Sequence, residues 1–156
     1  MMNKINAAYV GRLKETVKNS PYPAHMAMEI DEITVDHAVI GLDLKTFHLQ
    51  PFGIVHGGVL ATLIDTATFW AAFLRIPDQD GLVNVDLKLN YLKPVAKGRL
   101  RAEGKCLRPG KTISYAEASV LDENDTLVAH GTSTLMALTG KGLELGEAKF
   151  LKDGLS

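Results

Sequence analysis

The stretch His56-Gly57-Gly58-Val59-Leu60-Ala61-Thr62-Leu63-Ile64-Asp65-Thr66-Ala67-Thr68-Phe69-Trp70 lies near the middle of the 156-residue sequence and decides the fold. It opens the most apolar run of the chain, residues 59–74. The run is interrupted by Thr62, Asp65 and two further threonines, so it is too short and too polar to span a bilayer. It predicts one long buried helix over residues 56–74.

The rest of the sequence predicts one more helix and six strands around this long helix. Apolar residues recur at helical spacing over residues 3–19, and Ser20-Pro21-Tyr22-Pro23 ends that helix because proline and its predecessor disfavour helical backbone. Alternating apolar residues predict strands over residues 28–35, 38–45, 83–91, 100–107, 113–121 and 127–138. This order predicts an α+β fold in which a strongly curved antiparallel sheet wraps a single buried helix.

The composition is that of one globular domain. The chain is 46% apolar and 22% charged, and its net charge of −1 gives no reason to expect a nucleic acid or an anionic membrane as partner. We expect a single domain over residues 1–156, with a helical extension at residues 1–24 and a partly ordered tail at residues 140–156. The first ten residues contain no long apolar segment typical of a signal peptide, so a cytoplasmic location is the default expectation.

Disulfide and metal chemistry are not expected. Cys106 is the only cysteine, so neither an intrachain disulfide nor a Cys-rich zinc site can form, and its position in a strand suggests a core residue. The five histidines are scattered along the chain, which argues against a metal site.

The two glycines at the start of the long helix indicate a special backbone position. Each glycine costs a helix roughly 1 kcal/mol relative to alanine. Gly57 and Gly58 therefore either let the helix pack tightly on the sheet or let a ligand approach the backbone closely. The free N–H groups and positive dipole end of a first helical turn suit a developing oxyanion.

Asp65 is an unusual residue for the middle of an apolar helix, because aspartate is a poor helix former and an unpaired buried carboxylate is costly. It follows Gly58 by two turns on nearly the same face. Asp65 is either a structural carboxylate that is hydrogen-bonded to the backbone or to a threonine, or a general base or nucleophile.

His56 has two interpretations, as a general acid/base or as a residue whose ring nitrogens cap the loop. It lies half a turn out of phase with Asp65, so a His–Asp pair within one subunit is not expected. The sequence lacks a Gly-x-Ser-x-Gly motif, and no Ser-His-Asp arrangement is indicated.

The motif Gly53-x-x-His56-Gly57-Gly58, followed by Asp65 within the helix, resembles the hotdog-fold acyl-CoA thioesterases, in the branch that includes the phenylacetate-pathway enzymes (PaaI-like). The segments Asn90-Tyr91-Leu92-Lys93-Pro94 and Arg108-Pro109-Gly110-Lys111-Thr112 extend the match, which covers roughly residues 25–139. The resemblance implies a hotdog fold and obligate dimers, often paired into tetramers, with active sites at the subunit interface. It implies a small-molecule acyl-CoA substrate and no separate cofactor, since coenzyme A is part of the substrate.

The resemblance also implies roles for individual residues. The Gly57 N–H would polarise the thioester carbonyl, and Asp65 from the partner subunit would activate water or attack directly. Gln50 would orient the carbonyl or the water, and His56 would support the loop or contact the substrate. The residues expected to bind the substrate are Gly58, Asn84, Thr68, Phe69, Arg108, Gly110, Lys111 and Thr112.

Several alternatives stay open at this stage. Relatives usually combine Gln with Glu, or Asn with Asp, whereas this chain combines Gln50 with Asp65, so the choice between base and nucleophile is not decided. A non-catalytic acyl-CoA sensor and a hotdog acyl dehydratase are the alternative functions. Phe52, Phe69, Trp70 and Phe73 form either an aryl or medium-chain pocket or plain core.

Overall fold

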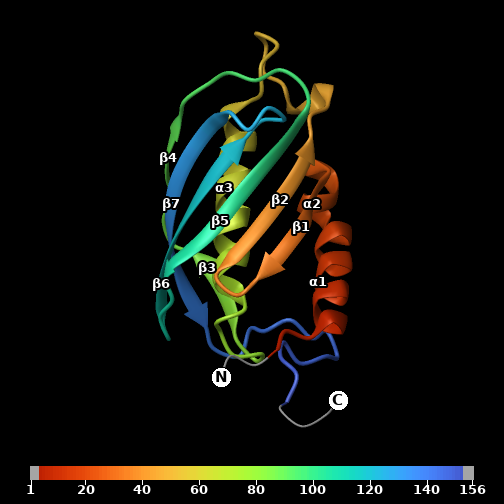
Figure 1. Ribbon diagram of the computed structural model, residues 1–156, viewed down its shortest axis with the longest axis vertical. Helices are drawn as coiled ribbons and strands as arrows, with labels where there is room; N and C mark the ends of the chain where they lie inside the picture. The colour runs from red at the N-terminus through yellow and green to blue at the C-terminus, as the bar shows by residue number, and fades with distance from the viewer. Residues whose placement is uncertain (1–3, 153–156) are drawn as a thin grey trace.

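A seven-stranded antiparallel sheet curves around one long helix in the computed structural model, which describes residues 4–152 (Figure 1). The helices are α1 (Ala7–Asn19), α2 (Pro21–Met26) and α3 (Gly57–Phe73), with a short 3-10 helix η1 (Thr46–His48). The strands are β1 (Met28–Thr34), β2 (His37–Asp43), β3 (Gly81–Asn84), β4 (Lys88–Tyr91), β5 (Arg99–Arg108), β6 (Ile113–Leu121) and β7 (Leu127–Leu138). Their order in the sheet is β1-β2-β5-β6-β7-β3, and β4 also pairs with β7.

The long helix α3 is packed against the concave side of the sheet, and its middle is held there at unusually short range. Leu63, Ile64 and Ala67 of α3 are fully buried. A Cβ atom on Gly104 of β5 would collide with the backbone carbonyl of Ala67, and one on Gly131 of β7 would lie 3.0 Å from Ile64 Cγ2. Glycine is therefore required at Gly104, because no larger residue lets the helix backbone come so close. At Gly131 a Cβ would first collide with the Lys88 carbonyl of the neighbouring strand β4, so glycine there serves the sheet as well as the helix.

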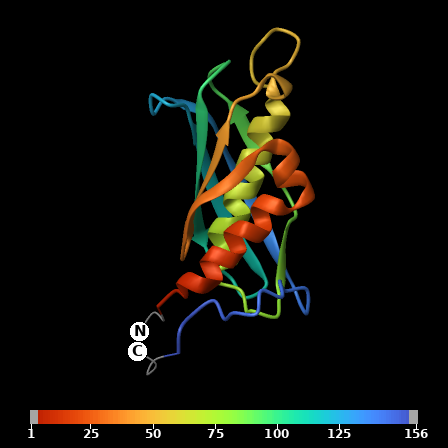
Figure 2. The same ribbon diagram turned by 90° about the vertical axis from the view of Figure 1, so that its right-hand side faces the viewer.

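The N-terminal helix and the C-terminal segment are both part of the folded unit. Helix α1 buries Tyr9, Leu13 and Val17, and it packs beside β1 and α2 at the edge of the sheet (Figures 1 and 2). The Asn6 N–H donates to the Lys149 carbonyl at 2.9 Å, so the segment after β7 runs back to the start of α1. The part of the tail up to residue 152 is thus tied to the core, while residues 153–156 lie outside the described range.

The Lys149 side chain connects the C-terminal segment to the end of α3. It is buried, and its ammonium group donates to the carbonyls of Phe73 and Ile76 at 3.1 and 2.8 Å. The same group lies 4.1 Å from the centre of the Phe73 ring. Lys149 therefore satisfies carbonyl groups that the end of a helix leaves without intrahelical partners.

Two details differ from the expectation. The prolines that end α1 also begin a second helix, α2, because proline is favoured in the first turn of a helix. The strand expected over residues 83–91 is divided into β3 and β4. Asn84 pairs with Leu135 and Lys88 with Thr132, so three residues of this chain segment lie opposite two of β7. Such an extra residue is a bulge, which alternation in the sequence does not reveal.

Candidate active site

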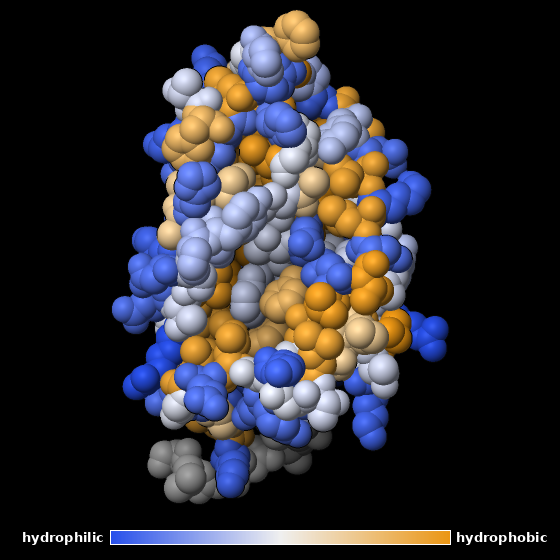
Figure 3. Space-filling view, turned by 180° about the vertical axis from the view of Figure 1, so that it is seen from behind, coloured by the Kyte–Doolittle hydropathy of each residue, from blue (hydrophilic) through white to orange (hydrophobic). Residues whose placement is uncertain are grey.

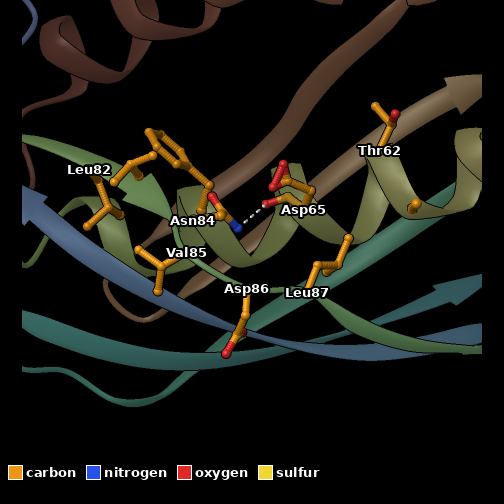
Figure 4. A pocket seen from close by; sticks show the side chains of 10 residues that line it. Thr62, Asp65, Leu82, Asn84, Val85, Asp86 and Leu87 are labelled. Carbon is orange, nitrogen blue, oxygen red and sulfur yellow. Dashed lines mark hydrogen bonds between the residues drawn. The ribbon is translucent and has the colours of Figure 1, made fainter.

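Asp65 lies in the middle of α3, and its carboxylate faces a cavity of about 630 Å³ (Figure 4). The cavity is bounded by α3 and by the irregular segment that joins β3 to β4. Among residues 4–152, the carboxylate has neither a hydrogen-bond partner nor an ion-pair partner. Burial raises the pKa of Asp65 above the ordinary value of 3.8. The structure therefore holds an unpaired, partly desolvated carboxylate at the wall of a cavity, as a general base or nucleophile requires.

Polar groups behind Asp65 bind its backbone and leave its carboxylate free. The Asn84 amide donates to the Asp65 carbonyl at 3.3 Å and to Ser133 Oγ at 2.8 Å (Figure 4). The fully buried Thr68 hydroxyl donates to the same carbonyl at 2.9 Å. Of these two expected substrate-binding residues, Asn84 lines the cavity and Thr68 lies behind its wall.

Gly57 and Gln50 share a second cavity, of about 380 Å³, at the start of α3. Within the described residues, the Gly57 N–H has no hydrogen-bond acceptor. The Gln50 side-chain oxygen accepts from the Phe52 N–H, so the amide NH₂ group is the part available to another carbonyl. The cavity therefore combines a free N–H at a helix start with a side-chain amide donor, the chemistry of an oxyanion site.

His56 is the N-cap of α3. Its Nδ1 accepts a hydrogen bond from the Gly58 N–H at 2.8 Å. This agrees with the second interpretation of His56, a ring that caps the loop, and the same bond occupies the Gly58 N–H. Of the two adjacent glycines, Gly57 is the one whose N–H stays free.

Sequence reasoning missed two residues around this second cavity. Tyr91 belongs to it, and its ring lies so close that a Cβ on Gly57 would be 2.9 Å from Tyr91 Cζ. His48 is buried and holds the loop before α3. The Lys45 N–H donates to Nδ1 at 2.9 Å, so Nε2 carries the proton and donates to the Met26 carbonyl at 2.8 Å. The matched Asn90-Tyr91 segment was a signal for Tyr91, whereas nothing in the sequence separates His48 from the other histidines.

The cavity at Asp65 and the cavity at Gly57 have no lining residue in common. Asp65 is eight helical steps from Gly57, which corresponds to roughly 12 Å along the helix axis. One chain therefore does not bring the carboxylate and the free N–H to the same thioester carbonyl, since each group must approach its target within about 3 Å.

Three of the expected substrate-binding residues come together in a third cavity. Gly110, Lys111 and Thr112 line a space of about 480 Å³ beyond the C-terminal end of α3, beside Arg75. Arg108 is exposed and is not part of that wall.

Of the four aromatic residues, Phe52 belongs to neither a pocket nor the core. Phe52 is 89% exposed in the loop, while Trp70 and Phe73 are buried in the core. Phe69 is only partly buried, and its ring lies in the wall of the Asp65 cavity.

An apolar surface accompanies the irregular β3–β4 edge. The face opposite that of Figure 1 carries many apolar side chains around a hollow (Figure 3). Val83, Val85, Tyr91 and Leu92 are exposed along this edge. Residues 4–152 contain neither a helix able to cross a membrane nor a group of three or more side chains placed to hold a metal ion.

Comparison with known proteins gives the family. The model of the thioesterase superfamily matches residues 52–129. A Saccharolobus solfataricus protein that bears the name "Putative esterase" is 33% identical over 67% of this chain and 74% of its own length. The crystal structure of a thioesterase from Haemophilus influenzae is similar with a TM-score of 0.80 at 25% identity, covering 90% of this chain and 97% of that chain.

The PaaI protein of the E. coli phenylacetic acid degradation operon has the same fold, with a TM-score of 0.78 at 17% identity over 90% of this chain and all of that one. The expected hotdog fold, PaaI-like resemblance and enzyme class, a thioester hydrolase, are confirmed. The chain belongs to the thioesterase superfamily.

Proposed function

We propose that the protein hydrolyses acyl-coenzyme A to a free acid and coenzyme A, with Asp65 as the base or nucleophile. The observation that carries this proposal is the unpaired Asp65 carboxylate at the wall of a 630 Å³ cavity. An aspartate in an apolar helix lowers stability, and the thioesterase superfamily supplies a reaction that needs it.

The oxyanion that forms during the reaction is stabilised at the start of α3. The Gly57 N–H donates to the thioester oxygen, and the Gln50 amide orients that oxygen or the attacking water. Both groups line one cavity, and fixed donors of this kind are worth roughly 10²–10³ in kcat. His56 acts through the loop, as the cap of the helix that presents Gly57.

Each active site is formed by two copies of the chain, one supplying Gly57 and Gln50 and the other Asp65. The separation of the two cavities within one chain supports this arrangement. The exposed apolar residues of the β3–β4 edge supply a surface for the second copy, because strand edges and apolar patches of this kind favour association. A tetramer is a further association of such dimers.

The coenzyme A part of the substrate extends toward basic residues. Lys111 lines the third cavity with Gly110 and Thr112, and it is the cation best placed there for a phosphate, since Arg75 is already paired with Asp36 at 2.8 Å. Arg108 adds positive charge to the neighbouring surface. No cofactor is required, because water is the second reactant.

The test is steady-state hydrolysis of a panel of aryl and short-, medium- and long-chain acyl-CoA esters, followed by release of free thiol. Asp65→Ala should lower kcat by about a hundredfold or more, as the loss of a general base does. Asp86→Asn is the matched control. Asp86 lines the same cavity, but its Oδ1 accepts from the Thr134 N–H at 2.8 Å, a bond that an asparagine oxygen can keep.

The outcomes separate the candidate functions. Saturable hydrolysis that is lost in Asp65→Ala and largely kept in Asp86→Asn supports the proposal. A fully active Asp65→Ala variant would remove Asp65 from the mechanism. Tight binding of the esters with no hydrolysis of any would indicate an acyl-CoA sensor.

A further inference from the structure

A further apolar cavity, here called the inner cavity, adjoins the Asp65 cavity and is not used by the reaction described above. Its volume is about 280 Å³, and it is lined by α1, the second half of α3, β3 and the segment after β7, with a mouth that opens at α1. Trp70, Phe73, Leu82 and Leu138 supply apolar surface to its wall, and Val17 of α1 lies opposite the aromatic rings.

Two residues connect this cavity to the carboxylate. Phe69 and Leu82 line both the 280 Å³ cavity and the Asp65 cavity. Phe69 follows Asp65 by four residues, so the two side chains lie on the same face of α3, one turn apart. A group that extends from the reacting carbonyl beside Asp65 therefore reaches the Phe69 ring first.

The Phe69 ring is packed into the aromatic wall of the inner cavity. It stacks on Phe73 with ring centres 5.8 Å apart and meets Trp70 edge to face at 4.8 Å. This aromatic surface starts one turn from the carboxylate and continues along the wall of the inner cavity.

We propose, on the basis of the function proposed above, that the acyl group of the substrate passes Phe69 and occupies this inner cavity, which restricts the enzyme to compact apolar acyl groups. The volume of the inner cavity determines the size of the acyl groups that it accepts. An engineered apolar cavity of roughly 150 Å³ encloses benzene. A space of about 280 Å³ takes an aryl or medium-chain acyl group, and a long fatty acyl chain does not fit inside it.

The N-terminal helix and the C-terminal segment take part in substrate specificity, because both contribute to the wall of the inner cavity. Thr16 and Val17 of α1 and Leu143 of the C-terminal segment form the outer part of the wall. Lys149, whose ammonium group lies over the Phe73 ring, fixes that segment against α3. The length of the accepted acyl chain is therefore limited by two segments that lie outside the matched residues 52–129.

The test narrows the cavity from α1 and measures binding of S-alkyl-CoA thioethers, which carry the alkyl chain but no cleavable bond. Thr16 is exposed and lines the cavity, so Thr16→Trp adds a large side chain at its mouth without entering the core. Glu15→Trp is the matched control, since Glu15 is the exposed neighbouring residue on α1 and does not line the cavity.

Dissociation constants for the S-ethyl and S-octyl compounds are measured by calorimetry on the full chain. Thr16→Trp should weaken S-octyl binding about tenfold more than S-ethyl binding. A factor of this size is what the loss of one or two buried methylene groups from an apolar pocket causes. Glu15→Trp should leave the ratio of the two constants unchanged. Phe69→Ala should change the same ratio, because it removes the ring between the two cavities.

An octyl-to-ethyl ratio that is the same in the wild type, Thr16→Trp and Phe69→Ala would overturn the proposal and place the acyl group elsewhere. This readout is independent of catalysis. If the ratio changes as expected but no ester is hydrolysed, the inner cavity is the acyl site and the proposed hydrolysis is wrong. If esters are hydrolysed but the octyl-to-ethyl ratio does not change, the proposed hydrolysis is correct and the acyl group does not occupy the inner cavity.

Discussion

The Asp65 carboxylate lowers the stability of the folded protein, because it is partly buried and has no partner among residues 4–152. It lies in α3, whose threonine hydroxyls all have hydrogen-bond partners. Asn84 and Thr68 stabilise the Asp65 carbonyl and leave the carboxylate unpaired. The surrounding residues thus fix the position of Asp65 without reducing the cost of its charge.

That cost predicts a pH-dependent gain in stability for Asp65→Asn. Burial raises the pKa of Asp65 in the folded state, so the folded protein binds this proton more tightly than the unfolded chain does. The stability that Asp65 contributes is complete below its unfolded pKa and is lost as the pH rises through the folded pKa. At neutral pH, Asp65→Asn should therefore raise the free energy of unfolding, measured by urea denaturation.

The difference in the free energy of unfolding between Asp65→Asn and the wild type should become smaller at acidic pH, where the wild-type carboxyl group is protonated and resembles the amide. Asp86→Asn should show no such gain, because the Asp86 carboxylate is hydrogen-bonded to the Thr134 N–H. A lower stability of Asp65→Asn at neutral pH would mean that the carboxylate has a stabilising partner in solution.

At the scale of elements, the end of α3 depends on a side chain that is distant in sequence. Burial lowers the pKa of Lys149 to about 8, which leaves the ammonium charged at neutral pH and able to donate to several carbonyls at once. The Phe73 and Ile76 carbonyls accept two of these hydrogen bonds. The C-terminal segment thus contributes a helix cap as well as cavity wall.

Lys149→Met should destabilise the protein by about 1–3 kcal/mol at neutral pH, because it removes the ammonium donor from the Ile76 carbonyl and leaves the Phe73 carbonyl with only the long bond from the Ile76 N–H, while keeping most of the side-chain volume. Thermal unfolding and urea denaturation check this. Lys152→Met is the control, since Lys152 is exposed in the same segment and should leave stability unchanged within about 0.5 kcal/mol. Equal effects of the two variants would show that the cap contributes nothing.

The elements also show what the sequence could predict. The apolar run after Gly58 predicts α3, and the alternating residues predict the curved antiparallel sheet, because each pattern specifies one buried face. The division into β3 and β4 was not predictable, since it depends on hydrogen bonds that Asp86 accepts from Ser133 and Thr134 of another strand. Helix α2 was missed because prolines that end one helix can also start another.

As with the helices and strands, only part of the candidate site could be predicted from the sequence. Asp65 and Gly57 are recognisable because each contradicts the local preference for a stable helix. Phe69 was expected from the family resemblance, and the matched Asn90-Tyr91 segment was a signal for Tyr91, but only folding places these residues beside the two cavities. His48 left no such signal, because its role depends on the Met26 carbonyl, which is distant in sequence.

At the scale of the whole molecule, the separation of Asp65 from Gln50 and Gly57 predicts that two inactive variants restore each other. In a mixed dimer of Asp65→Ala and Gln50→Ala, one of the two sites contains both substitutions and the other contains neither. Random mixing places half of the chains in such dimers, so activity should recover to roughly a quarter of the wild-type value, given two-fold symmetry.

The measurement is hydrolysis after the two variants are unfolded together and refolded, compared with each variant refolded alone. A mixture that is no more active than the average of the two variants would mean that each site is built within a single chain.

The close contact of α3 with Gly104 and Gly131 also has a consequence for motion. These contacts lie on either side of Asp65, at the Ala67 carbonyl and the Ile64 side chain, and they leave the helix little room to slide or turn on the sheet. Amide hydrogens in the middle of α3 should therefore exchange with solvent about as slowly as global unfolding permits, while those of the loop at Gln50 exchange faster. The carboxylate is thus attached to the part of the molecule that moves least, so adjustment to different substrates falls to the loop and to the side chains around it.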